Sequence, residues 1–381
     1  MKTIGQTLLS RGGAIPARGF TLIELLISLS LGMIILAAIA VLFMVTSQSR
    51  DELELHSRQV ENGRFAVERI REGVRVAGFS GEVLPTKVHW QTPSAVAATA
   101  ATNNCDPTFG WDNDVTSAEA LAAGEVADWQ INHIHIPAGV GGINNAAAGT
   151  PAPCVANVKA GTDILFVRRV DTNETAVGSA TEGVLYLQNS FCSSDAFSFK
   201  LAAAPAAADQ AATYDLKTRA CGASTALAPL RKVHLTVYYV ATCNDCSGPG
   251  DGIPTLKRLD YASGGTMPAA STAESLVEGI ENIQIEYGMD TTDDGVPDKD
   301  PGLGRVFRTA AEVTDWTQVV AVKLYVLSRS LTERPEYPVD DKSYVIGSDG
   351  TALSALGGRY RRQMMTTVLQ LTNVANWRES Y

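Results

Sequence analysis

The feature that most constrains this chain is a long apolar run near its N-terminus. The run extends from Phe20 to Val45, and Glu24 is its single charged residue. At a rise of about 1.5 Å per residue, a helix of this length would span roughly 39 Å, enough to cross the hydrocarbon core of a bilayer. The rest of the chain contains no second long apolar run, which excludes a polytopic membrane protein.

The flanks of the apolar run indicate how it is oriented. Residues 1–19 contain three basic residues and no acidic one, whereas Arg50 is followed by two acidic residues. Because basic flanks stay on the cytoplasmic side, we expect a cytoplasmic N-terminus and an exported remainder. A cleaved secretory signal fits poorly, since its apolar part would be shorter and would end at a small-residue site. Hydropathy alone leaves a plain single-pass anchor open.

Glu24 is the residue that points to a more specific class. A carboxylate within an apolar membrane segment is costly and is usually functional or paired. It closes residues 19–24, which read Gly-Phe-Thr-Leu-Ile-Glu. This stretch resembles the class III signal of type IV prepilins and type II secretion pseudopilins. The resemblance implies that a membrane prepilin peptidase cuts after Gly19 and methylates the new N-terminal amine of Phe20.

The same resemblance implies an assembly role for Glu24. Its carboxylate would pair with the Phe20 amine of a neighbouring subunit, and the cost of burying an unpaired charge would favour the correct register. An interfacial carboxylate near the lipid headgroups is the alternative. Cleavage would leave 381 − 19 = 362 residues, and the loss of three cations would change the formal charge from -10 to -13.

Residues 46–80 are predicted to continue the helix in amphipathic form. Leu53, Val60, Val67 and Val74 recur every seven residues, and charged residues occupy other positions. This spacing is typical of a helix that lays one apolar stripe on a globular domain. A free coiled coil is the alternative, although polar residues interrupt its seam. The two parts together predict one helix of about 60 residues, the handle-like helix typical of pilins.

Residues 81–381 are predicted to form an exported, β-rich head, with a variable insertion at about 85–225. Seven segments combine β-branched and aromatic residues with alternating polarity. These expected strands are 163–170, 183–187, 232–241, 255–259, 280–287, 317–328 and 363–372. We expect an α+β fold in which an antiparallel sheet packs against the second half of the long helix.

The order of the later segments sharpens the resemblance. Four stretches carry it: Tyr238–Val240, Leu276–Gly288, Trp316–Ser330 and Tyr360–Val368. Their order resembles the PilW family of type IV pilus minor pilins. The resemblance implies a minor pilin that helps to prime the pilus or to form its tip complex. Its implied partners are the prepilin peptidase, other minor pilins, the major pilin, a tip adhesin and the inner membrane.

The cysteines favour disulfides, because an even number of them lies in the part of the chain that is expected to be exported. Six cysteines allow 15 connectivities. Pairing between sequence neighbours would join Cys105 to Cys154, Cys192 to Cys221 and Cys243 to Cys246. A zinc site would need a second close ligand pair, and a redox-active CxxC would normally begin a helix, so both are weaker alternatives.

An acidic loop follows the strand expected at 280–287. Counting from Asp290, the loop places oxygens at the odd positions of a calcium loop and a glycine at the sixth. The candidate ligands are Asp290, Thr292, Asp294, the Val296 carbonyl and Asp298. Thr292 replaces an acid at the third position, and no bidentate glutamate stands at the twelfth. A weak calcium site and a solvated acidic turn without metal both stay open, so calcium is the one candidate cofactor.

The sequence offers no enzymatic site. His133 and His135 would share one face of a strand, but no third metal ligand lies near them in sequence. Nucleophile-elbow, zinc-protease, Walker and Rossmann signatures are all missing. The net charge of -10 also argues against direct nucleic-acid binding, which needs a basic surface.

These observations predict a minor pilin that is held in the inner membrane by one span, with a periplasmic head, before it joins the filament or its tip. A minor pseudopilin of type II secretion is the first alternative. A calcium-modulated protein of the pilus tip, acting in adhesion or DNA uptake, is the second.

Overall fold

A computed structural model describes residues 19–81, 104–108, 111, 136–192, 195, 197, 199–221, 226–261 and 272–379. Residues 1–18 of the expected leader, together with His133 and His135, lie outside these ranges. The chain divides into two compact units, Met1–Leu55 and His56–Tyr381. Helix α1, Leu22–Arg75, begins in the first unit and ends in the second.

Helix α1 realises the long helix expected from the sequence. In the second unit, its seven-residue stripe is buried at Val67 and Val74, and Ile70 between them is fully buried. Leu53 was expected in the same stripe but is 69% exposed, because it lies before the globular unit begins. The chain leaves the helix through Gly78, whose φ of +74° is a left-handed conformation that favours glycine.

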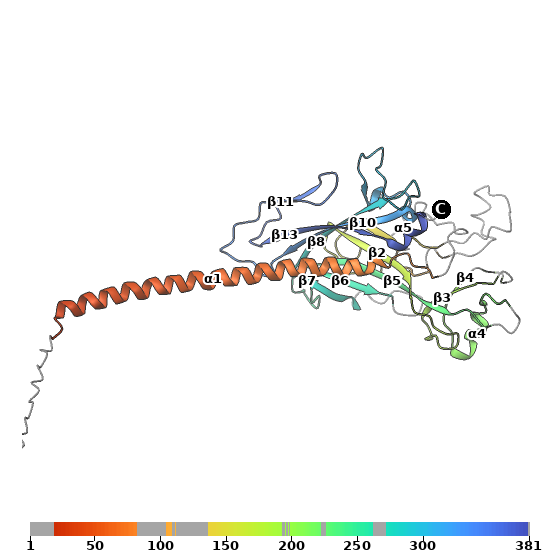
Figure 1. Ribbon diagram of the computed structural model, residues 1–381, viewed down its shortest axis with the longest axis horizontal. Coiled ribbons are helices and arrows are strands. Elements are labelled where there is room, and N and C mark those ends of the chain that lie inside the picture. The colour runs from red at the N-terminus through yellow and green to blue at the C-terminus, as the bar shows by residue number, and fades with distance from the viewer. Residues whose placement is uncertain are drawn as a thin grey trace, which may run out of the picture. The chain divides into compact units, whose positions relative to one another are not determined.

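A seven-stranded antiparallel sheet forms one layer of the head (Figure 1). Its strand order is β1-β2-β5-β3-β4, and β6 pairs with both β5 and β7. The strands are β1 Val140–Ala146, β2 Thr162–Val170, β3 Leu185–Asn189, β4 Phe199–Ala203, β5 Leu230–Ala241, β6 Thr255–Asp260 and β7 Glu274–Glu278. A short helix, α4 Gln210–Thr213, lies between β4 and β5 in the chain.

A four-stranded antiparallel sheet, in the order β13-β10-β8-β9, forms a second layer. Its strands are β8 Ile280–Met289, β9 Phe307–Thr309, β10 Val319–Arg329 and β13 Arg362–Gln370. The chain crosses from the first sheet to the second at Gly279, between β7 and β8. A hairpin of β11 Ser343–Val345 and β12 Ala352–Ser354 separates β10 from β13, and α5 Thr372–Glu379 follows β13.

The main core lies where α1 meets both sheets. It gathers Ile70 and Val74 of α1, Leu165 and Val167 of β2, and residues of β8 and β10. The intervening residues of β2 face a second core on the opposite side of the seven-stranded sheet. A strand buried on both faces explains why the four central residues of β2, 164–167, are all apolar.

The α+β fold class is confirmed, with a long N-terminal helix on antiparallel sheets. Each of the seven expected strands is present, with small shifts of its ends. Two ends differ for a structural reason. Residues Trp316–Gln318 form a 3-10 turn capped by Asp315, so β10 begins at Val319, and Thr372 begins α5 and is not part of β13. The described residues of 85–225 include β1 to β4 and α4.

Candidate functional site

The segment expected to be processed lies directly before α1. Gly19 and Phe20 precede the helix, and the Phe20 side chain is 82% exposed. Thr21 and Glu24 form a reciprocal pair at the helix start. The Thr21 N–H and hydroxyl donate to Glu24 Oε2 at 3.1 and 2.9 Å, and the Glu24 N–H donates to Thr21 Oγ1 at 3.3 Å. This is a capping box, which satisfies N–H groups that a helix start leaves without partners.

The capping box gives Thr21 a role that the sequence analysis did not assign. The signal was nevertheless local, because a threonine three residues before a glutamate and ahead of an apolar run predicts such a box. If the chain begins at Phe20, the helix starts at Leu22, the third residue of the mature protein, with Thr21 as its cap. The structure therefore holds Glu24 near the new N-terminus.

The apolar residues after Glu24 are exposed to an unusual degree. Large side chains from Leu25 to Val45 are between 53% and 73% exposed. In the described part of the chain, α1 is the one helix that meets length and composition criteria for a membrane span, with a mean hydropathy of 2.8 over an 18-residue window. A surface of this size needs lipid or other apolar helices around it.

The acidic loop after β8 is organised around a buried carboxylate. Asp290 has no exposed surface. Its Oδ1 accepts the N–H groups of Thr292 at 3.1 Å and Asp293 at 2.7 Å, and its Oδ2 accepts that of Gly295 at 3.0 Å. Arg378 of α5 donates to Asp290 Oδ2 at 3.0 Å. Both oxygens of this carboxylate are therefore already engaged.

The other acidic side chains of the loop are also engaged. Asp298 Oδ2 accepts the N–H groups of Thr291 at 2.7 Å and Thr292 at 3.0 Å, and the Thr291 hydroxyl at 2.8 Å. The bond from the Thr291 hydroxyl, followed by those from the N–H groups, lowers the pKa of Asp298. Asp294 accepts the Val296 N–H at 2.9 Å. The loop is thus a set of side-chain-capped turns.

This donor set does not fit a calcium ion. The two residues that could replace the missing acids are paired with arginines, Asp293 with Arg378 and Asp300 with Arg308. A cation at Asp290 would also face the Arg378 guanidinium, which repels it. Among the described residues, the structure gathers no group of three or more acidic, histidine or cysteine side chains suited to a metal.

The six cysteines form three disulfides between sequence neighbours. The bonds are Cys105–Cys154, Cys192–Cys221 and Cys243–Cys246. The first lies in the core on the far side of the seven-stranded sheet from α1, where both of its cysteines are buried.

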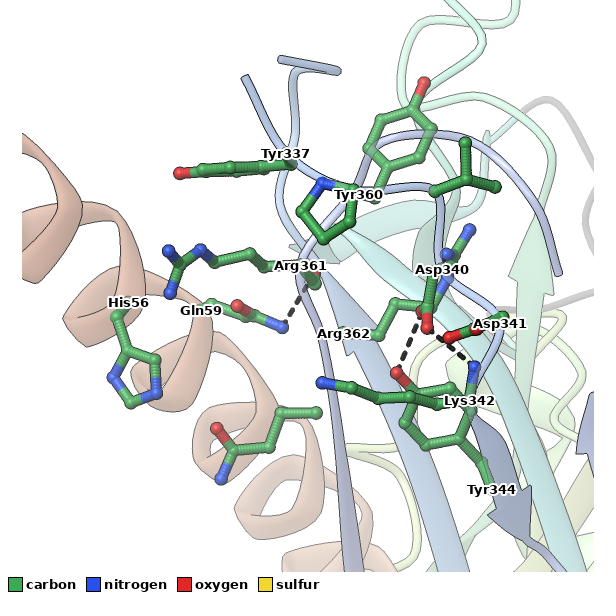
Figure 2. Close-up of a pocket in the computed structure, with 13 residues that line it drawn as sticks. His56, Gln59, Tyr337, Asp340, Asp341, Lys342, Tyr344, Tyr360, Arg361 and Arg362 are labelled. Carbon is green, nitrogen blue, oxygen red and sulfur yellow. Dashed lines mark hydrogen bonds and ion pairs between the residues drawn. The ribbon is translucent and has the colours of Figure 1, made fainter. Parts of the chain in front are cut away.

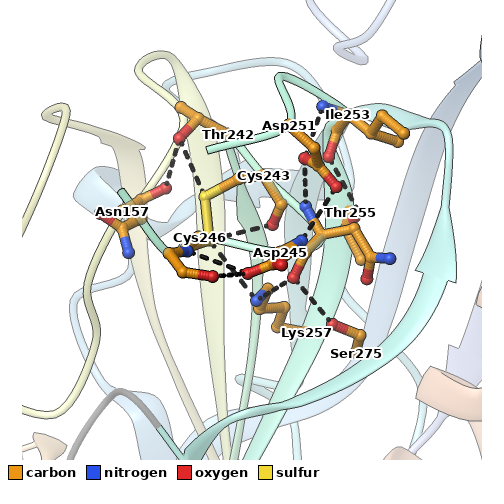
Figure 3. The surroundings of a disulfide bond; sticks show 12 residues. Asn157, Thr242, Cys243, Asp245, Cys246, Asp251, Ile253, Thr255, Lys257 and Ser275 are labelled. Carbon is orange, nitrogen blue, oxygen red and sulfur yellow. Dashed lines mark hydrogen bonds between the residues drawn. A yellow bond between two sulfur atoms is a disulfide. The ribbon is translucent and has the colours of Figure 1, made fainter. Parts of the chain in front are cut away.

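The Cys243–Cys246 bond closes the turn after β5 (Figure 3). Its loop has supports besides the disulfide. The Asp251 carboxylate accepts the N–H groups of Asn244 and Asp245, both at 2.9 Å, and the Lys257 ammonium donates to the Asn244 carbonyl at 2.9 Å. These bonds support the turn together with the disulfide.

Two family models match segments of this molecule. The model described as Type IV Pilus-assembly protein W covers residues 237–373, from within β5 to the start of α5. The model described as Prokaryotic N-terminal methylation motif covers residues 16–40, which include Gly19, Phe20 and Glu24. The chain belongs to the PilW family of type IV pilus assembly proteins. No curated protein or solved structure matches it.

The two family matches indicate what the N-terminal unit does. The prepilin-type motif indicates processing by prepilin peptidase, and the apolar helix anchors the protein in the inner membrane before pilus assembly. The PilW segment is a structural component of the pilus. It contains the second sheet, the acidic loop and the Cys243–Cys246 turn, whereas the other two disulfides lie before it.

A cavity of about 400 Å³ lies between α1 and residues 337–363 of the PilW segment, which belong to the β10–β13 connection and the start of β13 (Figure 2). His56 and Gln59 line it from α1. On its other side lies a buried ion cluster in which Arg362 pairs with Asp340 at 2.9 Å and with Glu281. Burial raises the pKa of Asp340, but the bonds from Arg362 and Tyr344 outweigh it and lower the pKa overall.

The cavity walls are held by contacts among their own residues. Gln59 donates to the carbonyls of Ser328 at 3.1 Å and Arg361 at 3.0 Å, and Tyr344 donates to Asp340 at 2.9 Å. The Arg361 guanidinium stacks 4.6 Å from the Tyr337 ring. Such engaged groups support a structural junction and offer no arrangement of nucleophile and base. The sequence carried no local signal for it, because its residues, from His56 to Gln363, are up to 307 positions apart.

Proposed function

We propose that this protein is a minor pilin that takes part in type IV pilus assembly, in priming of the filament and in formation of its tip complex with other minor pilins. The observation that carries the proposal is the exposed apolar half of α1, which begins with a prepilin-type motif in a chain of the PilW family. That surface would be covered first by lipid and then by the helices of neighbouring pilins.

In this proposal, prepilin peptidase removes residues 1–19 and leaves Phe20 as the N-terminal residue. The Glu24 carboxylate then pairs with the Phe20 amine of a neighbouring subunit. The capping box with Thr21 supports this role, because it holds the carboxylate at the start of the helix. In an apolar surrounding, an ion pair is far less costly than either charge alone, so correctly staggered helices are favoured.

The proposal assigns no catalytic activity to the chain. Its partners are prepilin peptidase, other minor pilins, the major pilin and a tip adhesin. The head lies in the periplasm and the N-terminus in the cytoplasm until the protein enters the filament. A minor pseudopilin of type II secretion shares the N-terminal chemistry and is the alternative that the experiment must separate. The engaged carboxylates of the acidic loop give no support to calcium-modulated adhesion.

Deletion of the gene, followed by complementation with variants, tests the proposal. We expect deletion to abolish or reduce surface pili and to leave secretion of exported enzymes intact. Glu24→Ala should be processed and inserted normally yet fail to restore pili, whereas Ser30→Ala, on the same helix, should restore them. Lost secretion with normal piliation would instead identify a pseudopilin, and full piliation with Glu24→Ala would refute the role of Glu24.

A further inference from the structure

Strand β13 presents an unpaired edge with a defined set of main-chain groups. It pairs with β10 along its whole length without a register shift. The Leu371 N–H donates to the Val320 carbonyl and the Ser330 N–H donates to the Arg361 carbonyl, so the odd-numbered residues of β13 face β10. In an antiparallel ladder the alternate residues face away. Met364, Thr366 and Val368 therefore direct their N–H and C=O groups to the other edge.

That edge is open in the part of the chain that the structure describes. β13 is the terminal strand of its sheet, and no described group bonds to its outward N–H or C=O groups between Met364 and Gln370. The sheet face on which these alternate side chains lie is exposed as well, since Thr366 and Gln370 are exposed and Val368 is 53% exposed.

The edge of β13 lacks the devices that normally protect a strand. From Gln363 to Leu371 it has no charged residue, no proline and no bulge. The other edges of the two large sheets are protected: β1 is interrupted by a register shift, β4 has five residues and carries Lys200, β7 begins and ends with glutamate, and β9 has three residues. A long, regular, uncharged edge is a template for another strand, and proteins otherwise avoid it.

We propose that the β13 edge receives an extended, uncharged strand from a second protein, which adds to the four-stranded sheet by main-chain hydrogen bonds. This inference rests on the proposed function for the nature of that protein, a neighbouring component of the pilus. An extended peptide matches the spacing of the donors and acceptors along a strand. The exposed Thr366 and Val368 side chains match β-branched partners, and a charged strand would find no countercharge along this edge.

A second copy of this chain is a poorer occupant for a geometric reason. Gln59 bonds to the Arg361 carbonyl, and Asn373 bonds to the Ala77 carbonyl, so α1 and β13 run in the same direction. Two β13 edges paired antiparallel about a two-fold axis would set these helical segments in opposite directions. Copies that follow one another in a filament would have these segments pointing the same way.

The test uses the full chain in detergent micelles and a short, end-blocked peptide of alternating threonine and valine as the probe. Amide hydrogen exchange is measured residue by residue by NMR. We expect the peptide to protect the amides of Met364, Thr366 and Val368, and to leave the already paired amides between them unchanged. A version of the peptide with proline at every second position should protect none of them.

Variants of one residue separate the edge from the rest of the fold. Thr366→Pro removes an outward N–H and no bond to β10, so it should weaken peptide binding about five- to tenfold. Thr366→Ala keeps the N–H and should bind as the wild type does. Should the proline variant fold poorly, Thr366→Lys places a charge on the edge and should weaken binding similarly.

Three results would overturn the inference: no peptide-dependent protection of the outward amides, unchanged binding by both edge variants, or protection that rises with protein concentration in the absence of peptide. The last would identify a second copy as the occupant. These measurements do not depend on pili. If the protein binds the peptide but deletion of its gene leaves piliation intact, the docking proposal stands and only the proposed role in the pilus is rejected.

Discussion

The two sheets of the head are tied together by one buried carboxylate, and its removal gives a measurable test. Asp163 of β2 is 2% exposed. Its Oδ1 accepts the N–H of Asn145 in β1 at 2.8 Å, and its Oδ2 accepts the N–H of Ile285 in β8 at 2.7 Å. Asp163→Ala would leave both N–H groups without this acceptor.

The structure sets the expected cost. The Ile285 N–H is buried, and a buried donor without a partner costs about 1–3 kcal/mol. Asn145 is exposed, so water can replace part of its bond, at about 0.5–1.5 kcal/mol. We therefore expect Asp163→Ala to lower the free energy of unfolding by about 2–4 kcal/mol. Asp163→Asn keeps one carbonyl oxygen and should cost about half as much.

The pH dependence adds a second readout. Burial raises the pKa of Asp163 to about 7, although the bonds from Asn145 and Ile285 act in the opposite direction. The folded state then holds its proton more tightly than the unfolded state, whose pKa is 3.8. The stabilising contribution is complete below pH 3.8 and is lost as the pH rises toward 7. The steepest loss is about 1.4 kcal/mol per pH unit.

Urea unfolding of the full chain in detergent, followed by tryptophan fluorescence between about pH 4 and about pH 7, measures both effects. Asp163→Asn has no proton to release, so the fall in stability seen for the wild type should be shallower. Asp209→Asn, at an exposed aspartate, is the control and should change stability by less than about 0.5 kcal/mol. Parallel pH profiles for wild type and Asp163→Asn would refute the reasoning.

Three further outcomes can be measured. A Cβ at Gly142 would lie 2.9 Å from the Tyr287 ring, so Gly142→Ala should lower the thermal midpoint. Tyr287→Phe removes a buried hydroxyl that has no hydrogen-bond partner among the described residues, and it should partly restore the midpoint of the Gly142→Ala variant. Additive effects of the two substitutions would contradict the contact. The Cys243–Cys246 bond should be the first of the three to be reduced, as followed by thiol alkylation and mass spectrometry. Through chain entropy it stabilises the folded state by about 2 kcal/mol, against about 4 kcal/mol for the bonds of 49- and 29-residue separation. Simultaneous reduction of all three bonds would contradict this order. Arg378→Ala should lower the free energy of unfolding by about 3 kcal/mol in urea titrations, and calcium should leave the thermal midpoint of the wild type unchanged; a calcium-dependent rise would show that the acidic loop binds the ion after all.

Much of this architecture could be read from local patterns. The strands β5, β8 and β10 are predictable from β-branched residues and from alternating polarity over a few positions. These signals are local and do not depend on which segments pack against the strands. The local patterns gave the wrong result where packing against distant segments sets the backbone conformation. Thr372 is β-branched and continues the alternation of β13, yet it begins α5, whose Val374 and Ala375 pack into the main core.

The acidic loop shows the same limit for a site. Spacing from Asp290 predicts which oxygens could converge, because a loop of this length is a local object. It does not predict that Arg378, 88 positions away, occupies the carboxylate. A cluster of acidic side chains attracts a positive charge, which can be a metal ion or the guanidinium of an arginine. Only the packing of distant segments decides which of the two lies there.

By itself, the sequence determined the membrane helix, the processing motif at 19–24 and membership of the PilW family, because hydropathy and a peptidase signal act over contiguous residues. The tertiary structure alone decided that Asp163 ties two sheets, that Arg378 fills the acidic loop and that β13 has an open edge. Each of these depends on which distant segments are brought within hydrogen-bonding distance, and no local pattern encodes that.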